Sequence, residues 1–222
     1  MAMTAIERLQ KEVIACRRCP RLVDYCADVA LVKRRAFIES TYWGRPVPSF
    51  GDPRARLLII GLAPAAHGAN RTGRMFTGDR SGDFLYRALY ETGFATQLTS
   101  KHRNDGLELR GAYITAAVRC APPANKPELS EMENCRSYLL RELELLTEVR
   151  VVVALGKIAF DSFLKVRPMK GAKFGHGTVN RYSDGRVLLA SYHPSQQNTF
   201  TGKLTMPMLV GVFRKARRIC DE

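Results

Sequence analysis

Short apolar runs alternate with amphipathic stretches along the chain. The runs at 56–61, 112–118 and 151–155 consist largely of Leu, Ile, Val and Ala, which is typical of parallel strands buried on both faces. Between them, apolar positions recur with the helical period. Strands that alternate with helices predict an α/β fold, with a central, mostly parallel sheet between two layers of helices.

Local signals predict where the other elements begin and end. Thr4 and Glu7 have the spacing of a capping box, and the Gly- and Pro-rich segment 41–55 predicts a loop. A hairpin is expected about residues 183–185, between strands at 173–182 and 186–192. No internal repeat divides the chain, so we expect one domain over residues 1–222. The helical patterns cover 4–15, roughly 27–38, 82–91, 129–148, 157–164 and 206–220.

The charge of the chain is strongly positive. It holds 35 Lys and Arg against 21 Asp and Glu, a net charge of +14 in 222 residues. This excess favours a polyanionic partner, of which nucleic acid is the commonest. A membrane surface is the weaker alternative, because no long basic helix with exposed aromatics stands out. Apolar runs are too short to span a bilayer and the first residues lack a signal-peptide core, so we expect a cytoplasmic protein without a membrane partner.

Four of the six cysteines have a spacing that suggests a metal site. Cys16 and Cys19 form C-x-x-C, Cys120 follows a predicted strand, and Cys135 lies in the next predicted helix. Four thiolates bind either a tetrahedral zinc ion or an iron–sulfur cube, and one short pair with two dispersed cysteines suits the bulkier cluster better. Inert buried thiols are the alternative, and the interpretation we give to Cys26 and Cys220.

Two loops carry more chemistry than a connector needs. The run GLAPAAHGANRTGRMFTGD, residues 61–79, follows a buried strand and is rich in glycine. The run SYHPSQQN, residues 191–198, follows another strand and contains His193. Ligands of open α/β sheets bind where such loops leave the carboxyl ends of the strands. We therefore expect the two loops to meet at one site.

These runs, together with YITAAVRCAPPANKP and the cysteine quartet, resemble the iron–sulfur uracil-DNA glycosylases, and within them family 5, the broad-specificity branch. The resemblance covers essentially residues 10–215. It implies a uracil-DNA glycosylase-like fold, a [4Fe–4S] cluster held by Cys16, Cys19, Cys120 and Cys135, and removal of uracil and other deaminated or modified bases from DNA after base flipping. A nucleoid-associated monomer is the expected form.

The resemblance also implies roles for residues of the loops. Phe76 matches the aromatic residue that stacks on the flipped base, and Asp79, the only carboxylate of the 61–79 loop, is expected to position or activate water. His193 is expected to donate a hydrogen bond to the departing base. The expected contacts to base or DNA are made by Gly61, Ala63, Asn70, Asn125, Ser195, Gln196 and Gln197, with Arg71 and Arg74 on phosphate.

Each assignment has a plainer alternative. Asp79 is well placed to cap the helix that follows it, Phe76 has the composition of a core residue, and Asn in a proline-rich turn is commonly a turn residue.

Two positions depart from the related family 4. Leu62 stands where that family has an acidic residue, and Ala116 stands where it has an Asn that reads the uracil edge. A site with fewer polar groups rejects analogues less strongly, so a broad substrate range is expected.

Three other classes of function share single features with this chain. A non-catalytic iron–sulfur DNA-binding module remains the alternative. A zinc deaminase is excluded because no His has a Glu two residues later, and a dinucleotide-binding enzyme is excluded because the first loop does not read G-x-G-x-x-G.

Overall fold

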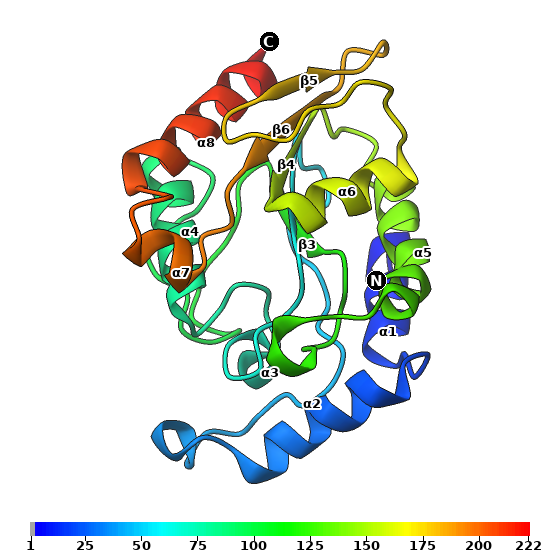
Figure 1. Cartoon of the computed structure of the whole chain (residues 1–222), viewed down its shortest axis with the longest axis vertical. Helices are drawn as coiled ribbons and strands as arrows, with labels where there is room; N and C mark the ends of the chain where they lie inside the picture. The colour runs from blue at the N-terminus through cyan, green and yellow to red at the C-terminus, as the bar shows by residue number, and fades with distance from the viewer. Residues whose placement is uncertain (1–2) are drawn as a thin grey trace.

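The computed structural model describes residues 3–222 and is built on a six-stranded sheet (Figure 1). The strand order is β1-β3-β2-β4-β6-β5, in which the four central strands are parallel and the two edge strands are antiparallel to their neighbours. The predicted α/β fold is therefore confirmed. The strands are β1 (Phe50–Gly51), β2 (Leu57–Gly61), β3 (Ala112–Ala116), β4 (Val151–Leu155), β5 (Val179–Arg181) and β6 (Val187–Ser191).

Helices cover both faces of the sheet (Figure 1). The helical elements are α1 (Ala5–Ile14), α2 (Pro20–Val32), η1 (Arg35–Phe37), α3 (Ala69–Thr72), α4 (Arg80–Glu91), η2 (Pro123–Asn125), α5 (Leu129–Leu145), α6 (Lys157–Val166), α7 (Gln196–Phe200) and α8 (Met206–Asp221). Among residues 3–222, no helix is both long enough and apolar enough to span a bilayer.

The alternation of side chains along the strands divides the core in two. Leu57 and Ile59 face α4 and α8, whereas Leu58 and Ile60 face α1, α5 and α6. All four are fully buried, and burying one such side chain stabilises the fold by roughly 1.5–3 kcal/mol. A third cluster packs Cys26, Cys120 and Cys135 between α2 and the start of α5.

The second helix lies where the sequence pattern did not place it. The pattern predicts a helix over roughly 27–38, but α2 begins at Pro20 and ends at Val32. Proline is favoured in the first helical turn because its φ angle is already helical and its missing N–H needs no partner there. At the other end Lys33 has a φ of 54°, which stops the helix. The capping box of Thr4 and Glu7 is confirmed.

Candidate active site

Three loops at the carboxyl edge of the sheet enclose one cavity of about 610 Å³. They follow β2, β3 and β6, so the prediction that the first and last of them meet is confirmed. Ligand cavities commonly have this size, and this edge of an open α/β sheet is where they form. The lining residues are Leu62, Ala63, Pro64, Ala65, Met75, Phe76, Asp79, Arg80, Ser81, Ala124, Asn125, His193, Ser195, Gln196 and Gln197.

Backbone strain is concentrated around this cavity. Four non-glycine residues of the described chain have a positive φ, and three of them line the cavity: Phe76 at 51°, Ala124 at 51° and Asn125 at 57°. Such conformations cost on the order of 1–3 kcal/mol each and persist where they serve a site. The strained residues therefore gather at this cavity, an observation that does not depend on any sequence motif.

Phe76 is fixed over the end of β2. A Cβ atom on Gly61 would lie 2.8 Å from two ring carbons of Phe76, so only glycine leaves room for the ring there. The Phe76 ring also lies 6.0 Å from the His193 ring, centroid to centroid, with 32° between the planes. The role predicted for Gly61 is thus an indirect one, because it seats the ring and does not line the cavity itself.

Asp79 lies half-buried at the start of α4 and caps that helix. Its Oδ1 accepts a hydrogen bond of 2.9 Å from the Gly82 N–H, and its Oδ2 fills the space that a Cβ on Gly68 would need, only 1.9 Å away. Burial raises the pKa of this carboxyl, while the backbone N–H groups of Gly82 and Ser81 and the charge of Arg71 oppose the rise. Capping and lining the cavity coexist in one side chain.

His193 is held by its backbone and leaves its ring available. Its carbonyl accepts a hydrogen bond of 2.9 Å from Asn198 Nδ2, whereas neither ring nitrogen is bonded to any of residues 3–222. Burial lowers the pKa of His193 to about 4. The ring is therefore a neutral imidazole at physiological pH, with one N–H free to donate.

A second histidine, which the sequence did not single out, supports the strand end that carries His193. The backbone N–H of Tyr192 donates to His176 Nδ1 over 3.3 Å, and His176 Nε2 lies 3.3 Å from the Met208 carbonyl oxygen. Nδ1 must accept, so the proton of a neutral His176 lies on Nε2. His176 comes from the irregular segment before β5, and no motif or spacing marks it.

Two of the residues predicted to contact DNA are buried. Asn70 is fully buried, and its amide donates to the carbonyl oxygens of Cys26 and Ala66. The side chain of Arg74 is 4% exposed and forms an ion pair of 2.8 Å with Asp105. Both residues lie beneath the surface and organise the loop.

The remaining predicted contacts lie at or near the cavity. Ala63, Asn125, Ser195, Gln196 and Gln197 line it, with Ser195 also capping α7. Arg71 lies beside it and donates to the carbonyl oxygens of His67 and Gly78, both over 2.8 Å, so it braces the 61–79 loop. Contacts of these side chains with DNA stay predictions.

The four cysteines predicted as ligands line one separate cavity with Leu22, Val23 and Pro46. All six cysteines of the chain are free thiols, and Cys26 lies next to the four, since its Sγ accepts from the Ala121 N–H over 3.2 Å. As the side chains stand, no three His, Cys, Asp or Glu of residues 3–222 are grouped to hold a metal ion. Burial, with the nearby Cys19 and Cys16 thiols, raises the pKa of Cys135 to about 11 although Arg119 acts to lower it.

Comparison with known proteins supplies the relatives of this chain. The family model described as "Uracil DNA glycosylase superfamily" matches residues 48–217. A type-5 uracil-DNA glycosylase of Mycobacterium leprae is 52% identical over 97% of this chain and 96% of that protein. One from Thermus thermophilus is 50% identical over 96% of this chain and 97% of its own length. A type-4 uracil-DNA glycosylase of Sulfurisphaera tokodaii is similar at 26% identity over 87% of this chain and 76% of that protein.

Proposed function

The chain belongs to the uracil DNA glycosylase superfamily and to its type-5 branch, and we propose that the cavity at the carboxyl edge of the sheet is where it excises uracil from DNA. The observation that carries the proposal is the convergence of Phe76, Asp79 and His193, from two distant loops, on one cavity with a strained backbone. The alternative of a non-catalytic DNA-binding module finds no support among relatives that are named as glycosylases.

The base is held by shape and stacking. A glycosylase must turn the nucleotide out of the double helix and enclose its base. Phe76 offers an aromatic ring fixed by Gly61, and Leu62, Pro64 and Met75 supply apolar walls. Stacking on an aromatic ring is worth about 1–3 kcal/mol per base and does not depend on which base it is.

Hydrolysis proceeds as water adds to C1′ of the sugar while the bond to the base breaks. The sugar becomes cationic in the transition state, as in other glycosyl transfers, and the base leaves with the bonding electron pair. The Asp79 carboxylate orients the water, stabilises the sugar cation and accepts the proton that the water releases. Arg71 and the N–H groups of Gly82 and Ser81 favour the charged form that this role requires.

His193 stabilises the departing base. A neutral imidazole donates its N–H to the oxygen on which negative charge develops, without the penalty of a buried cation. Two contacts fix the position of the residue. One is the hydrogen bond from Asn198, and the other is close packing on Gly156, where a Cβ would lie 3.3 Å from His193 Cβ.

Two positions at or near the cavity lack a polar side chain that could read the edge of uracil. Leu62 contributes an apolar side chain, and Ala116 at the end of β3 is buried and carries no hydrogen-bonding group. Asn125 lines the cavity and carries an amide side chain, and its backbone has a positive φ angle. A site with fewer polar groups to read the base edge discriminates less strongly among similar bases, so the proposed range includes hypoxanthine, xanthine and etheno-cytosine besides uracil.

We also propose that Cys16, Cys19, Cys120 and Cys135 hold a [4Fe–4S] cluster. The donor set supports this, because four thiols, without a His, Asp or Glu, line one cavity between the α1–α2 connection, the loop after β3 and α5. A cube binds each thiolate at a different iron, so its ligands need not gather around one point. When bound, the iron–sulfur cluster would join these three segments. Ala63, from the loop after β2, packs against the buried side chains that surround the thiols.

The proposed specificity is tested with a panel of duplexes, each holding one damaged base, treated with alkali after incubation. Uracil, hypoxanthine, xanthine and etheno-cytosine should all yield strand breaks at the damaged position. Leu62→Asp should reduce the number of damaged bases that the protein excises, because an acidic group in the cavity should weaken the binding of most of these bases. Cleavage of uracil alone by the unchanged protein would contradict the proposed range.

A further inference from the structure

Two exposed arginines stack on one tryptophan beside the catalytic loop. The Arg45 guanidinium carbon lies 3.9 Å from the centroid of a Trp43 ring, and that of Arg103 lies 4.6 Å from it. Neither guanidinium donates a hydrogen bond or forms an ion pair within residues 3–222. Stacking on an aromatic ring orders an arginine but leaves its N–H groups free for a planar or tetrahedral anion.

The position of Trp43 is fixed by hydrogen bonds and by packing against the backbone. Trp43 Nε1 donates to the Pro46 carbonyl oxygen over 3.0 Å, and its backbone N–H donates to the Arg71 carbonyl oxygen over 2.9 Å. A Cβ on Gly73 would lie 2.8 Å from two indole carbons, so the ring packs directly against the backbone there. Trp43 is thereby attached to the loop that carries Phe76 and Asp79.

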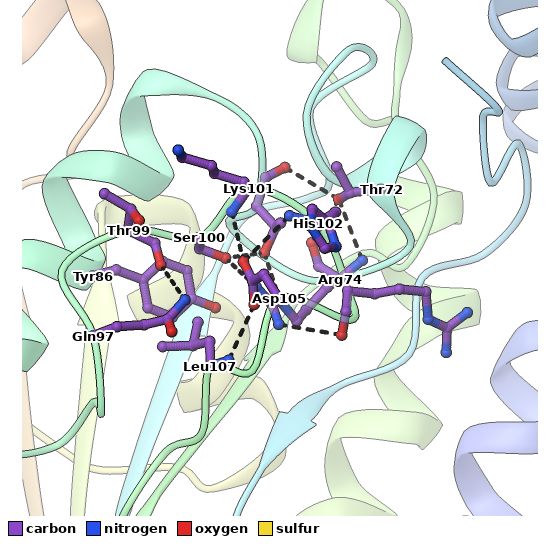
Figure 2. Close-up of polar contacts among 12 residues, drawn as sticks. Thr72, Arg74, Tyr86, Gln97, Thr99, Ser100, Lys101, His102, Asp105 and Leu107 are labelled. Atoms are coloured by element: carbon purple, nitrogen blue, oxygen red, sulfur yellow. Dashed lines mark hydrogen bonds and ion pairs between the residues drawn. The ribbon is translucent and has the colours of Figure 1, made fainter.

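Arg103 is presented by a loop whose interior is the Arg74–Asp105 ion pair (Figure 2). The Asp105 carboxylate accepts from Arg74 and also from the backbone N–H groups of Lys101, His102 and Leu107, over 2.8–3.3 Å. Arg74 Nη1 donates to the Arg103 carbonyl oxygen over 3.3 Å. The buried pair therefore orders the segment 101–107 and with it the exposed Arg103.

The place of the stack relative to the cavity suits a DNA strand. Gly73 precedes Phe76 by three residues, so their Cα atoms lie within roughly 11 Å of each other. The stack therefore packs on backbone near the ring proposed to hold the base, within a few base-pair rises of about 3.4 Å along the duplex axis. Lys101 and His102 are exposed beside Arg103, so the surface here is basic.

We propose that Arg45 and Arg103, stacked on Trp43, bind the phosphodiester backbone of the substrate strand within about three nucleotides of the excised base. The inference rests on the proposed function for the position of the base. The assignment gives Arg74 its role, since it acts from the interior by ordering the loop that carries Arg103.

The test is the salt dependence of binding to an undamaged duplex, which involves no excision. The plot of log K against log salt has a negative slope, and each lost phosphate contact makes that slope shallower by about 0.9. Replacing both residues, Arg45→Gln with Arg103→Gln, should make the negative slope shallower by about 1.8. Arg150→Gln is the matched control, because Arg150 is exposed and unpaired within residues 3–222 but precedes β4 at the opposite edge of the sheet.

A second measurement locates the contact. Duplexes containing uracil and one neutral methylphosphonate, moved stepwise along the strand, should bind the unchanged protein more weakly when the neutral group lies within about three steps of uracil. The double variant should be insensitive at that position. The proposal would be overturned if the double variant kept the original salt slope, or if Arg150→Gln reduced the slope as much as the double variant does. It would also be overturned if no position of the methylphosphonate weakened binding. Failure to excise uracil would instead contradict the proposed function and leave the salt slope interpretable.

Discussion

At the scale of single residues, the environments of Asp79 and His193 suit them to different roles in proton transfer and hydrogen bonding. Both are half-buried, yet the loss of solvent raises the pKa of the carboxyl and lowers the pKa of the imidazole. The carboxylate is supported by backbone N–H groups, whereas the imidazole has no bonded partner among residues 3–222. One residue is thus suited to accept a proton from water, and the other to donate a hydrogen bond while neutral.

Asp79→Asn separates catalysis from helix capping. Asparagine caps helices as well as aspartate does, so α4 should be kept. A positioned acid or base contributes roughly 100- to 10,000-fold, and the single-turnover excision rate should fall by at least about 100-fold. Because the pKa of Asp79 is raised in the folded protein, its ionisation costs stability as pH rises through that value. The variant should therefore unfold at the same or a higher temperature at neutral pH, and a wild-type rate would contradict the catalytic role.

His193→Ala removes the proposed donor to the leaving base. Such a donor is worth roughly 2.7–4 kcal/mol, a loss of about 100- to 1,000-fold in single-turnover rate, with little change in affinity for undamaged DNA. His102→Ala, which changes an exposed histidine outside the cavity, should leave the rate at saturating protein unchanged. Since the pKa of His193 is about 4, this ring should contribute no change in rate between about pH 6 and about pH 8. A limb near the ordinary histidine value that is present in the wild-type protein and absent from the residual rate of His193→Ala would show that the ring titrates there, because Asp79 is the same in both proteins.

At the scale of elements, the site depends on how strand ends and loops are held. The end of β6 is fixed by His176, and the 61–79 loop is braced by Arg71 and by the buried Arg74–Asp105 pair (Figure 2). These supports come from segments far apart in the sequence. They hold the cavity without entering it.

His176→Phe tests the support of β6. Phenylalanine preserves the ring that packs 5.3 Å from Tyr192 but leaves the Tyr192 N–H without its acceptor. An unsatisfied buried group costs about 1–3 kcal/mol, which urea unfolding should detect. The excision rate should fall as well, because the neighbouring His193 loses its fixed position. Unchanged stability would show that the Tyr192 N–H finds another partner.

The elements and the site differ in how far the sequence predicts them. Val151–Leu155 and the first helix are predicted closely because a continuous apolar run and a capping box are local signals. The role of Arg74 is not predicted from the sequence, because an arginine in a Gly-rich loop is expected to be exposed. Its ion-pair partner Asp105 lies thirty-one positions later in the chain and comes close only in the folded protein. His176 escapes prediction for the same reason, because its function lies in tertiary contacts alone.

At the scale of the whole molecule, the fold places two chemical sites next to each other. The cavity with Asp79 and the cavity of four thiols share the loop after β2, through Ala63. The topology produces this arrangement, because the β2 and β3 strands are paired in parallel and their loops leave the same edge. A cluster bound by the thiols would therefore stabilise the wall of the active site.

The cluster proposal predicts iron and sulfide in anaerobically purified protein, about four of each per chain, with visible absorption. Cys120→Ser should lose the iron and lower the unfolding temperature. Cys220→Ser is the matched control, because this buried cysteine lies on α8, away from the other thiols, and should retain the full iron content. A colourless, iron-free wild-type protein would refute the cluster.

The most direct test of the central claim is release of free uracil from a duplex that holds a single U, followed by mass spectrometry of the base and of the remaining strand. The wild-type protein should release uracil and leave an intact abasic strand, and folded Asp79→Asn should release it at least about 100-fold more slowly. Equal release by the two proteins would show that the reaction does not take place at this cavity as described.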